Sequence, residues 1–127
     1  MSRILIVEDS PDNMKLFTAV LGLSGYEVAG LSDGKGLVPK LEAWKPQLVL
    51  MDIQLPGCDG YTLFAELREC GYVDIPVIAL TAHAMAGDEE RAMEAGFDGY
   101  ITKPIDVRSF PDQIANVLRG KAGTEIA

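Results

Sequence analysis

Five residues with charged or hydroxyl side chains stand at or just after the ends of short apolar segments of the chain. Glu8 and Asp9 follow the first such segment, Asp52 the second, Thr81 the third and Lys103 the last. A carboxylate that directly follows a fully apolar segment is costly to bury without a partner, so Asp52 most needs a functional explanation. Carboxylates, a hydroxyl and an ammonium together are the groups that bind a metal ion and transfer a phosphoryl group.

Taken singly, the other four residues have ordinary structural alternatives. Asp9 can help to cap a helix that Pro11 opens, and Glu8 can be a solvated strand end. Thr81 can be a β-branched strand residue like many others, and Lys103 a loop lysine. The functional interpretation therefore depends on whether the fold brings them together.

If they converge, electrostatics predicts a bound cation. Two carboxylates about 4 Å apart repel each other by roughly 4 kcal/mol at an effective dielectric constant of 20, so three in one cleft need compensation. Lys103 and a divalent cation would supply it. Oxygen ligands favour Mg²⁺, with Mn²⁺ as a substitute, over zinc, for which the sequence has no His/Cys cluster. A metal ion beside a carboxylate nucleophile is typical of aspartyl phosphate formation.

The apolar segments themselves predict an α/β fold. Residues 4–7, 48–51, 77–80 and 100–101 lack polar alternation and are too short for helices, which is typical of strands buried on both faces. Residues 26–29 read as a fifth, edge strand. Three of the intervening stretches have apolar residues at helical spacing, represented by Phe17, Leu67 and Ile114.

Strict alternation of strand and helix predicts a doubly wound, five-stranded parallel sheet with helices on both faces. Helix start signals are expected at Ser10-Pro11, Asp59-Gly60 and Asp106, and Gly25 is expected to close the first helix. Ligands of such sheets bind beyond the carboxyl ends of the strands, where the five polar residues stand. No glycine-rich phosphate loop follows the first strand, which argues against a dinucleotide or P-loop site.

Composition restricts the partners. The 127 residues carry 11 Lys and Arg against 19 Asp and Glu, a formal charge of −8, which disfavours binding to nucleic acid or to an anionic membrane. No apolar run is long enough for a membrane span. Cys58 and Cys70 have no metal-like spacing and read as reduced thiols, so we expect a cytoplasmic protein.

Several short motifs, taken together, resemble the receiver domain of two-component response regulators, CheY-like in fold. The resemblance covers residues 3 to about 119 and lies in five places: residues 7–9, 51–56, 59–60, 79–82 and 100–104. Residues 13–17, 51–56 and 87–91 further resemble single-domain cell-cycle regulators of the DivK type, although receivers fused to hybrid histidine kinases share many of these motif residues. The resemblance implies the strand order 2-1-3-4-5.

The resemblance also implies roles for individual residues. Asp52 would accept a phosphoryl group, and Thr81 and Lys103 would bind the phosphoryl oxygens. The implied metal contacts are Glu8, Asp9, Asp52 and the main-chain carbonyl of Gln54. Thr81 and Tyr100 resemble the switch pair of the family, and Lys103-Pro104 resembles its cis peptide. For the single histidine, His83, the resemblance implies a position beside the acyl phosphate, where it would tune the lifetime of that group; the alternative is an exposed residue at a helix start.

For the whole chain we expect a receiver domain at residues 1–119 and a flexible tail at 120–127. The expected phosphoryl donor is a histidine kinase or histidine phosphotransferase, and the expected output is a protein contact through the face of the fourth helix, fifth strand and fifth helix. From the length of the chain we expect no attached output domain; the alternative is a receiver domain cut from a hybrid histidine kinase or a larger regulator. We expect a phosphoacceptor with at most weak self-phosphorylation and autodephosphorylation rather than an enzyme.

Three other classes compete with this interpretation. A small aspartyl-phosphate phosphatase of the haloacid-dehalogenase type should have Asp-x-Asp after the first strand, where this chain has Glu8-Asp9-Ser10. A flavodoxin-like electron carrier needs a hydroxyl- and glycine-rich loop where this chain places acids. A degenerate receiver acting as a scaffold would lack part of the five-residue set.

Overall fold

A five-stranded parallel sheet forms the centre of the computed structural model, which describes residues 2–55, 58–82 and 87–123. In chain order, its strands are β1 (Arg3–Val7), β2 (Glu27–Leu31), β3 (Leu48–Asp52), β6 (Val77–Thr81) and β7 (Gly99–Thr102). In space they run β2-β1-β3-β6-β7, all parallel. Counting only these five strands, this is the predicted order 2-1-3-4-5.

Burial within the sheet follows the sequence pattern. Every residue of β3 and β6 is buried, as are the last four of β1, because these central strands have neighbours on both sides and helices on both faces. The outer strands β2 and β7 are only partly buried. β2 begins one residue later than predicted and extends to Leu31, where it pairs with Val7.

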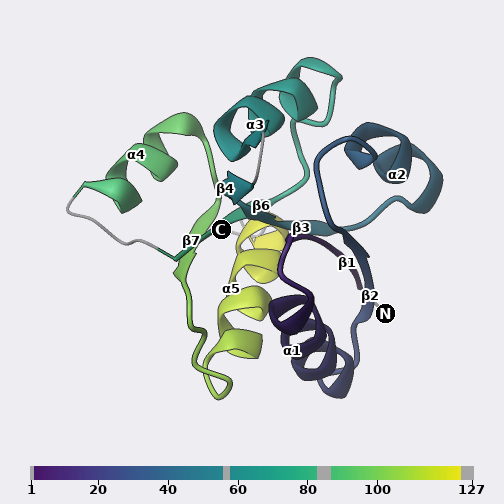
Figure 1. Cartoon of the computed structure of the whole chain (residues 1–127), viewed down its shortest axis with the longest axis vertical. Helices are drawn as coiled ribbons and strands as arrows, with labels where there is room; N and C mark the ends of the chain where they lie inside the picture. Colours follow the sequence, from purple (N-terminus) through teal and green to yellow (C-terminus); the bar gives the residue numbers. More distant parts are fainter. Residues whose placement is uncertain (1, 56–57, 83–86, 124–127) are drawn as a thin grey trace.

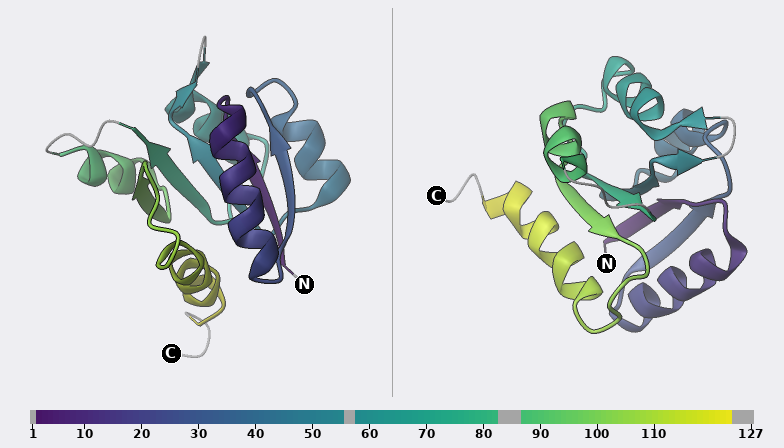
Figure 2. Two further views of the ribbon diagram at one scale, coloured as in Figure 1. Left: turned by 60° about the horizontal axis from the view of Figure 1, so that its bottom comes forward. Right: turned by 60° about the vertical axis from the view of Figure 1, so that its left-hand side comes forward.

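Helices cover the two faces of the sheet, as Figures 1 and 2 show. Helices α1 (Pro11–Leu23) and α5 (Phe110–Gly123) lie on one face. Helices α2 (Leu37–Trp44), α3 (Gly60–Glu69) and α4 (Asp88–Ala95) lie on the other. Each face has its own apolar core, the first around Phe17 and Phe110 and the second around Phe64 and Phe97. Alternate residues of each buried strand point into one core or the other.

The predicted caps are largely confirmed. The Ser10 hydroxyl accepts from the Asn13 backbone N–H, the Asp59 carboxylate accepts from Tyr61 N, and Gly25 follows α1 with φ +95°. Asp106 does not cap α5, which begins four residues later at Phe110. The Asp106 carboxylate closes a turn at Arg108, and its carbonyl accepts from Phe110 N.

Helix α5 continues to Gly123, past the predicted domain end at residue 119, and residues 124–127 lie outside the described residues. A second difference lies after β3. A two-stranded antiparallel hairpin, β4 (Gln54–Leu55) and β5 (Cys58–Asp59), was not predicted and leads from β3 into α3. None of the helices within the described residues is long and apolar enough to span a membrane.

Candidate functional site

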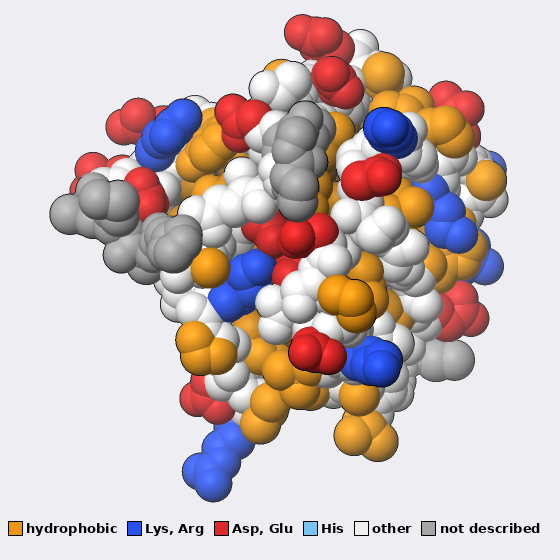
Figure 3. Space-filling model, in the orientation of Figure 1, with side chains coloured by type: hydrophobic (Ala, Val, Ile, Leu, Met, Phe, Trp, Pro, Cys, Tyr) orange, Lys and Arg blue, Asp and Glu red, His pale blue; other side chains and the backbone are white. Residues whose placement is uncertain are grey.

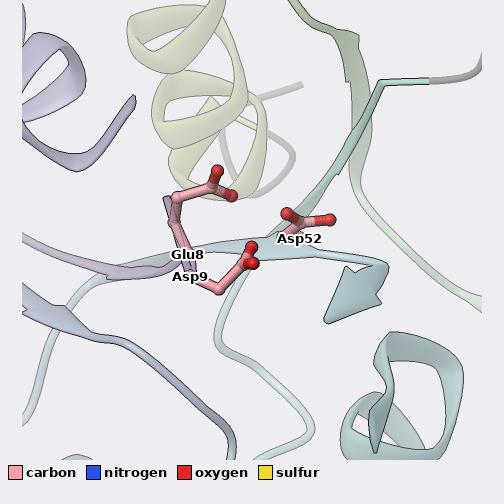
Figure 4. A group of neighbouring side chains, drawn as sticks. All are labelled: Glu8, Asp9 and Asp52. Carbon is pink, nitrogen blue, oxygen red and sulfur yellow. The ribbon is translucent and has the colours of Figure 1, made fainter. Parts of the chain in front are cut away.

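The carboxyl ends of four parallel strands bring the predicted site residues to one edge of the sheet. Glu8 and Asp9 follow β1, Asp52 ends β3, Thr81 ends β6 and Lys103 follows β7. Figure 4 shows the three carboxylates pointing toward one another, and Figure 3 shows acidic side chains at the centre of this face with a basic group beside them. The convergence expected from the topology is therefore present.

Lys103 makes the central ion pairs of the site. Its Nζ lies 2.9 Å from Asp52 Oδ2, 3.1 Å from Glu8 Oε1 and 3.3 Å from Glu8 Oε2. The Glu8 and Asp52 side chains are 0% and 2% exposed, and that of Lys103 is 12% exposed. One ammonium thus faces two buried carboxylates, with Asp9 beside them at the solvent side.

Neighbouring residues complete the hydrogen bonding of the two buried carboxylates. The Gln54 backbone N–H donates to Asp52 Oδ1 at 2.7 Å, and Asn13 Nδ2 donates to Glu8 Oε1 at 2.9 Å. Asn13 reaches Glu8 from the first turn of α1, which Ser10 caps. These donors hold the carboxylates in place and partly offset the cost of burying them.

The site shifts the pKa values of its two buried carboxyl groups in opposite directions. Burial, followed by the hydrogen bond with Asp52, raises the pKa of Glu8 to about 7. Burial also acts to raise the pKa of Asp52, but hydrogen bonds from Glu8, Lys103 and Gln54 outweigh it and leave that pKa below its usual value. Burial acts to lower the pKa of Lys103, but its two carboxylate partners raise it. Near neutral pH, Asp52 is therefore an anion and Lys103 a cation.

The donor set fits a divalent metal ion. Ligand oxygens of Glu8, Asp9 and Asp52 all lie within 4.8 Å of one another. They are carboxylate oxygens only, which suits a hard cation such as Mg²⁺. When Glu8 is ionised, Lys103 supplies one positive charge against three negative charges, and a divalent cation would offset the excess negative charge.

The predicted switch pair lies beside this cluster. Thr81 is 1% exposed, and its carbonyl accepts from Lys103 N at 2.7 Å, which ties the end of β6 to the residue that carries the ammonium. Burial, then the charge of Asp88, raises the pKa of Tyr100, while the nearby Thr81 hydroxyl acts to lower it. Within the described residues, no hydrogen bond of standard geometry reaches the buried Tyr100 Oη. The Lys103-Pro104 peptide is cis, as predicted.

The loop after Asp52 is held in place by a close backbone approach at Gly60. A Cβ at this position would lie 2.4 Å from Ile53 Cα and 2.9 Å from the Asp52 carbonyl oxygen. The Gly60 N–H also donates to the Ile53 carbonyl at 3.4 Å. Only glycine allows the start of α3 to pack this tightly on the residues that carry the Asp52 carboxylate.

Some functional contacts were not foreseen, and some predictions lie outside the described residues. The sequence motifs include Asn13 but assign it no contact; Asn13 lies in the first turn of α1, five residues after Glu8, to which it donates. The side chain of Gln54 makes a contact that no sequence pattern indicates, with its Oε1 2.9 Å from Ala82 N. His83 lies outside the described residues, as do residues 84–86 and the side chain of Cys58.

Comparisons with known proteins agree with this architecture. Residues 4–115 match the family of the response regulator receiver domain. The chain is 42% identical over 116 residues to the polar-differentiation response regulator DivK of Brucella anthropi, which covers 91% of this chain and 94% of that protein. DivK of Brucella ovis has the same identity and coverage.

Solved structures give the same result. The BeF3-activated N-terminal receiver domain of Klebsiella pneumoniae RstA superposes with a TM-score of 0.83 and 32% identity, covering 93% of this chain and 99% of that one. The CheY-like receiver domain protein of Methanospirillum hungatei superposes with a TM-score of 0.87 and 27% identity over 98% of both chains. With its fold, its acidic cluster and its sequence in agreement, the chain belongs to the response regulator receiver domain family.

Proposed function

We propose that Asp52 accepts a phosphoryl group from the phosphohistidine of a histidine kinase or histidine phosphotransferase. The observation that carries this proposal is the buried Asp52 carboxylate, 2.9 Å from Lys103 Nζ and within the acidic cluster. An Asp52 oxygen forms the new O–P bond while the donor P–N bond breaks, and its electron pair stays on the imidazole. The chain acts as the acceptor in this transfer, with at most slow self-phosphorylation and autodephosphorylation of its own.

Different residues around Asp52 position the phosphoryl group and neutralise its charge. Lys103 orients and stabilises the phosphoryl oxygens, and Thr81 offers its hydroxyl to one of them. Glu8, Asp9, Asp52 and the main-chain carbonyl of Gln54 would hold Mg²⁺, or Mn²⁺ in its place. When bound, this ion supplies the positive charge that the three carboxylates lack and a contact for the entering phosphoryl group.

Phosphorylation would be signalled through the face made by α4, β7 and α5. This face has a groove of about 500 Å³ lined by Tyr100, Ile101 and Pro104, with Glu89 on α4 and Gln113 on α5. Among the described residues of α4, only Ala92 is buried, so this helix is held by few apolar contacts and its position is easily changed. A downstream protein would bind this face with an affinity that depends on the state of Asp52.

Acetyl phosphate with Mg²⁺ provides the test. Its transferable phosphoryl group should raise the intact mass of the protein by one phosphoryl group, and Asp52→Asn should abolish the adduct. Asp59→Asn is the matched control, since this exposed carboxylate lies in the same loop and asparagine also caps helices well. An adduct that persists in Asp52→Asn, or one that is absent from the wild-type protein, would contradict the proposal.

A further inference from the structure

Gln54 connects the ends of the two central strands that carry Asp52 and Thr81. Its backbone N–H donates to Asp52 Oδ1 at 2.7 Å, and its side-chain Oε1 accepts from the Ala82 backbone N–H at 2.9 Å. Asp52 pairs with Leu80 in the register of β3 and β6, so Ala82 lies just beyond the strand end next to Asp52. One glutamine therefore spans from the carboxylate to the Ala82 amide.

The Ala82 amide is a donor that a phosphoryl group on Asp52 would need. Phosphorylation places three strongly accepting oxygens where the carboxylate has two, and each requires a donor or a cation. The Asp52 oxygens already take up Gln54 N and Lys103 Nζ. A backbone N–H held at a strand end is a preorganised donor, because its position costs nothing to set at the moment of transfer.

We infer that the Gln54 side chain occupies the Ala82 N–H in the unmodified protein and is displaced from it by a phosphoryl oxygen when Asp52 is modified. This inference rests on the proposed function of Asp52. Gln54 then acts as a positioning residue with two opposite effects: its backbone supports the Asp52 carboxylate, while its side chain competes with the modified state. The Gln54 side chain is exposed, so once displaced it is solvated by water without a further rearrangement.

The competition predicts that removal of the side-chain acceptor strengthens binding of a phosphoryl mimic. Gln54→Met keeps the length of the side chain and the backbone but has no carbonyl. Its affinity for beryllofluoride in the presence of Mg²⁺ should rise about threefold to tenfold, the range that corresponds to one net hydrogen bond. Gln54→Glu retains an acceptor for Ala82 and adds a negative charge, so its affinity should fall below that of the wild-type protein.

The chain offers a matched control at the other end of the same strand. Gln47 is also exposed, precedes β3, and accepts from the Arg3 backbone N–H through its Oε1. Gln47→Met therefore removes the same kind of hydrogen bond far from Asp52. Its beryllofluoride affinity should equal that of the wild-type protein.

NMR gives a direct reading of the proposed contact. In the unmodified protein, the Ala82 amide proton should move upfield and exchange faster in Gln54→Met than in the wild type or in Gln54→Glu. Wild-type binding of beryllofluoride combined with an unchanged affinity in Gln54→Met, or with an Ala82 resonance that the substitution leaves in place, would overturn the inference. A wild-type protein that binds no beryllofluoride would instead overturn the proposed function, and the inference with it.

Discussion

Strand β1 has an ion pair at each of its ends, and the two differ in burial and in charge balance. At the amino end, Arg3 Nε lies 3.0 Å from Glu27 Oε2, and the two side chains are 45% and 46% exposed. At the carboxyl end, Lys103 Nζ lies 3.1 Å from Glu8 Oε1, and the Glu8 side chain is 0% exposed. The distances are nearly equal, so distance alone does not distinguish the two pairs.

The surroundings of each pair explain their different roles. Arg3 and Glu27 form a one-to-one pair in water, and Arg3 also donates to the Trp44 carbonyl at 2.7 Å. Such a pair contributes little to stability and is screened by salt. Lys103 instead faces an excess of carboxylates that are largely removed from water. That end of the strand is stable only to the extent that a cation or a proton offsets the excess, which makes it responsive to ligands.

The largest difference between the two ends should follow from removal of each cation. Lys103→Met, at pH 8 without divalent ions, should lower the free energy of unfolding by on the order of 3 kcal/mol, because two buried carboxylates lose the ammonium that they share. Arg3→Met should lower it by less than about 1 kcal/mol. Urea denaturation of both variants measures the two values. Equal losses would show that the buried and exposed pairs do not differ energetically.

The pH dependence of stability should also separate the two ends. The pKa of Glu8 is raised from 4.5 to about 7 in the folded protein, so the folded state holds a proton that the unfolded state has lost across this range. Its stabilising effect is complete below pH 4.5 and is lost as the pH rises through about 7. Without divalent ions, the free energy of unfolding should fall by on the order of 2 kcal/mol between pH 5 and pH 8.

Glu8→Gln should largely remove this slope, because the variant has no group to titrate at that position. The lowered pKa of Asp52 acts in a separate window, since its contribution is lost only as the pH falls below the usual carboxyl range. Glu27→Gln should keep the wild-type slope. Retention of the full slope in Glu8→Gln would assign the titration to another group.

Magnesium should bind only at the carboxyl end and should have a smaller effect. At ten times its dissociation constant, Mg²⁺ should stabilise the fold by about 1.4 kcal/mol, a rise of a few degrees in Tm. Potassium salt at matched ionic strength should not reproduce this rise. Glu27→Gln should respond as the wild type does, whereas Asp9→Asn should require more Mg²⁺. Stabilisation that is the same in Asp9→Asn would place the ion elsewhere.

The sequence predicts those parts of the fold that leave a clear pattern along the chain and misses those that do not. The central strands were predicted because segments such as residues 77–80 are apolar throughout and buried on both faces, and the parallel topology then brings Asp52 and Lys103 to one edge. The hairpin after Asp52 was missed because strands of two residues have no periodicity. The predicted start of α5 is wrong because Asp106 closes a turn before the helix. The same residue types, Asp among them, occur both at helix caps and in turns, so the sequence does not distinguish the two.

The Gln54 side chain could not have been placed from the sequence for a different reason. Its contact with Ala82 joins two residues 28 positions apart in the chain, and an exposed glutamine has no burial pattern that reveals its partner. The resemblance assigned a role only to its main-chain carbonyl. Side chains that link neighbouring loops at a strand end become visible only when the strand register is known.

The smallest expected effect is at Glu27, and its sign sharpens the comparison. Glu27→Gln removes an exposed charge but keeps an oxygen that accepts from Arg3, so the free energy of unfolding should fall by at most about 0.5 kcal/mol, and by less in high salt. The same substitution at Glu8 should raise the free energy of unfolding at pH 8 without divalent ions, because it removes a buried negative charge from a cluster with too many. Urea denaturation of the two Glu→Gln variants in parallel measures both signs. Two losses of equal size would mean that Lys103 alone balances its end of β1, and the need for a further cation at Asp52 would no longer follow.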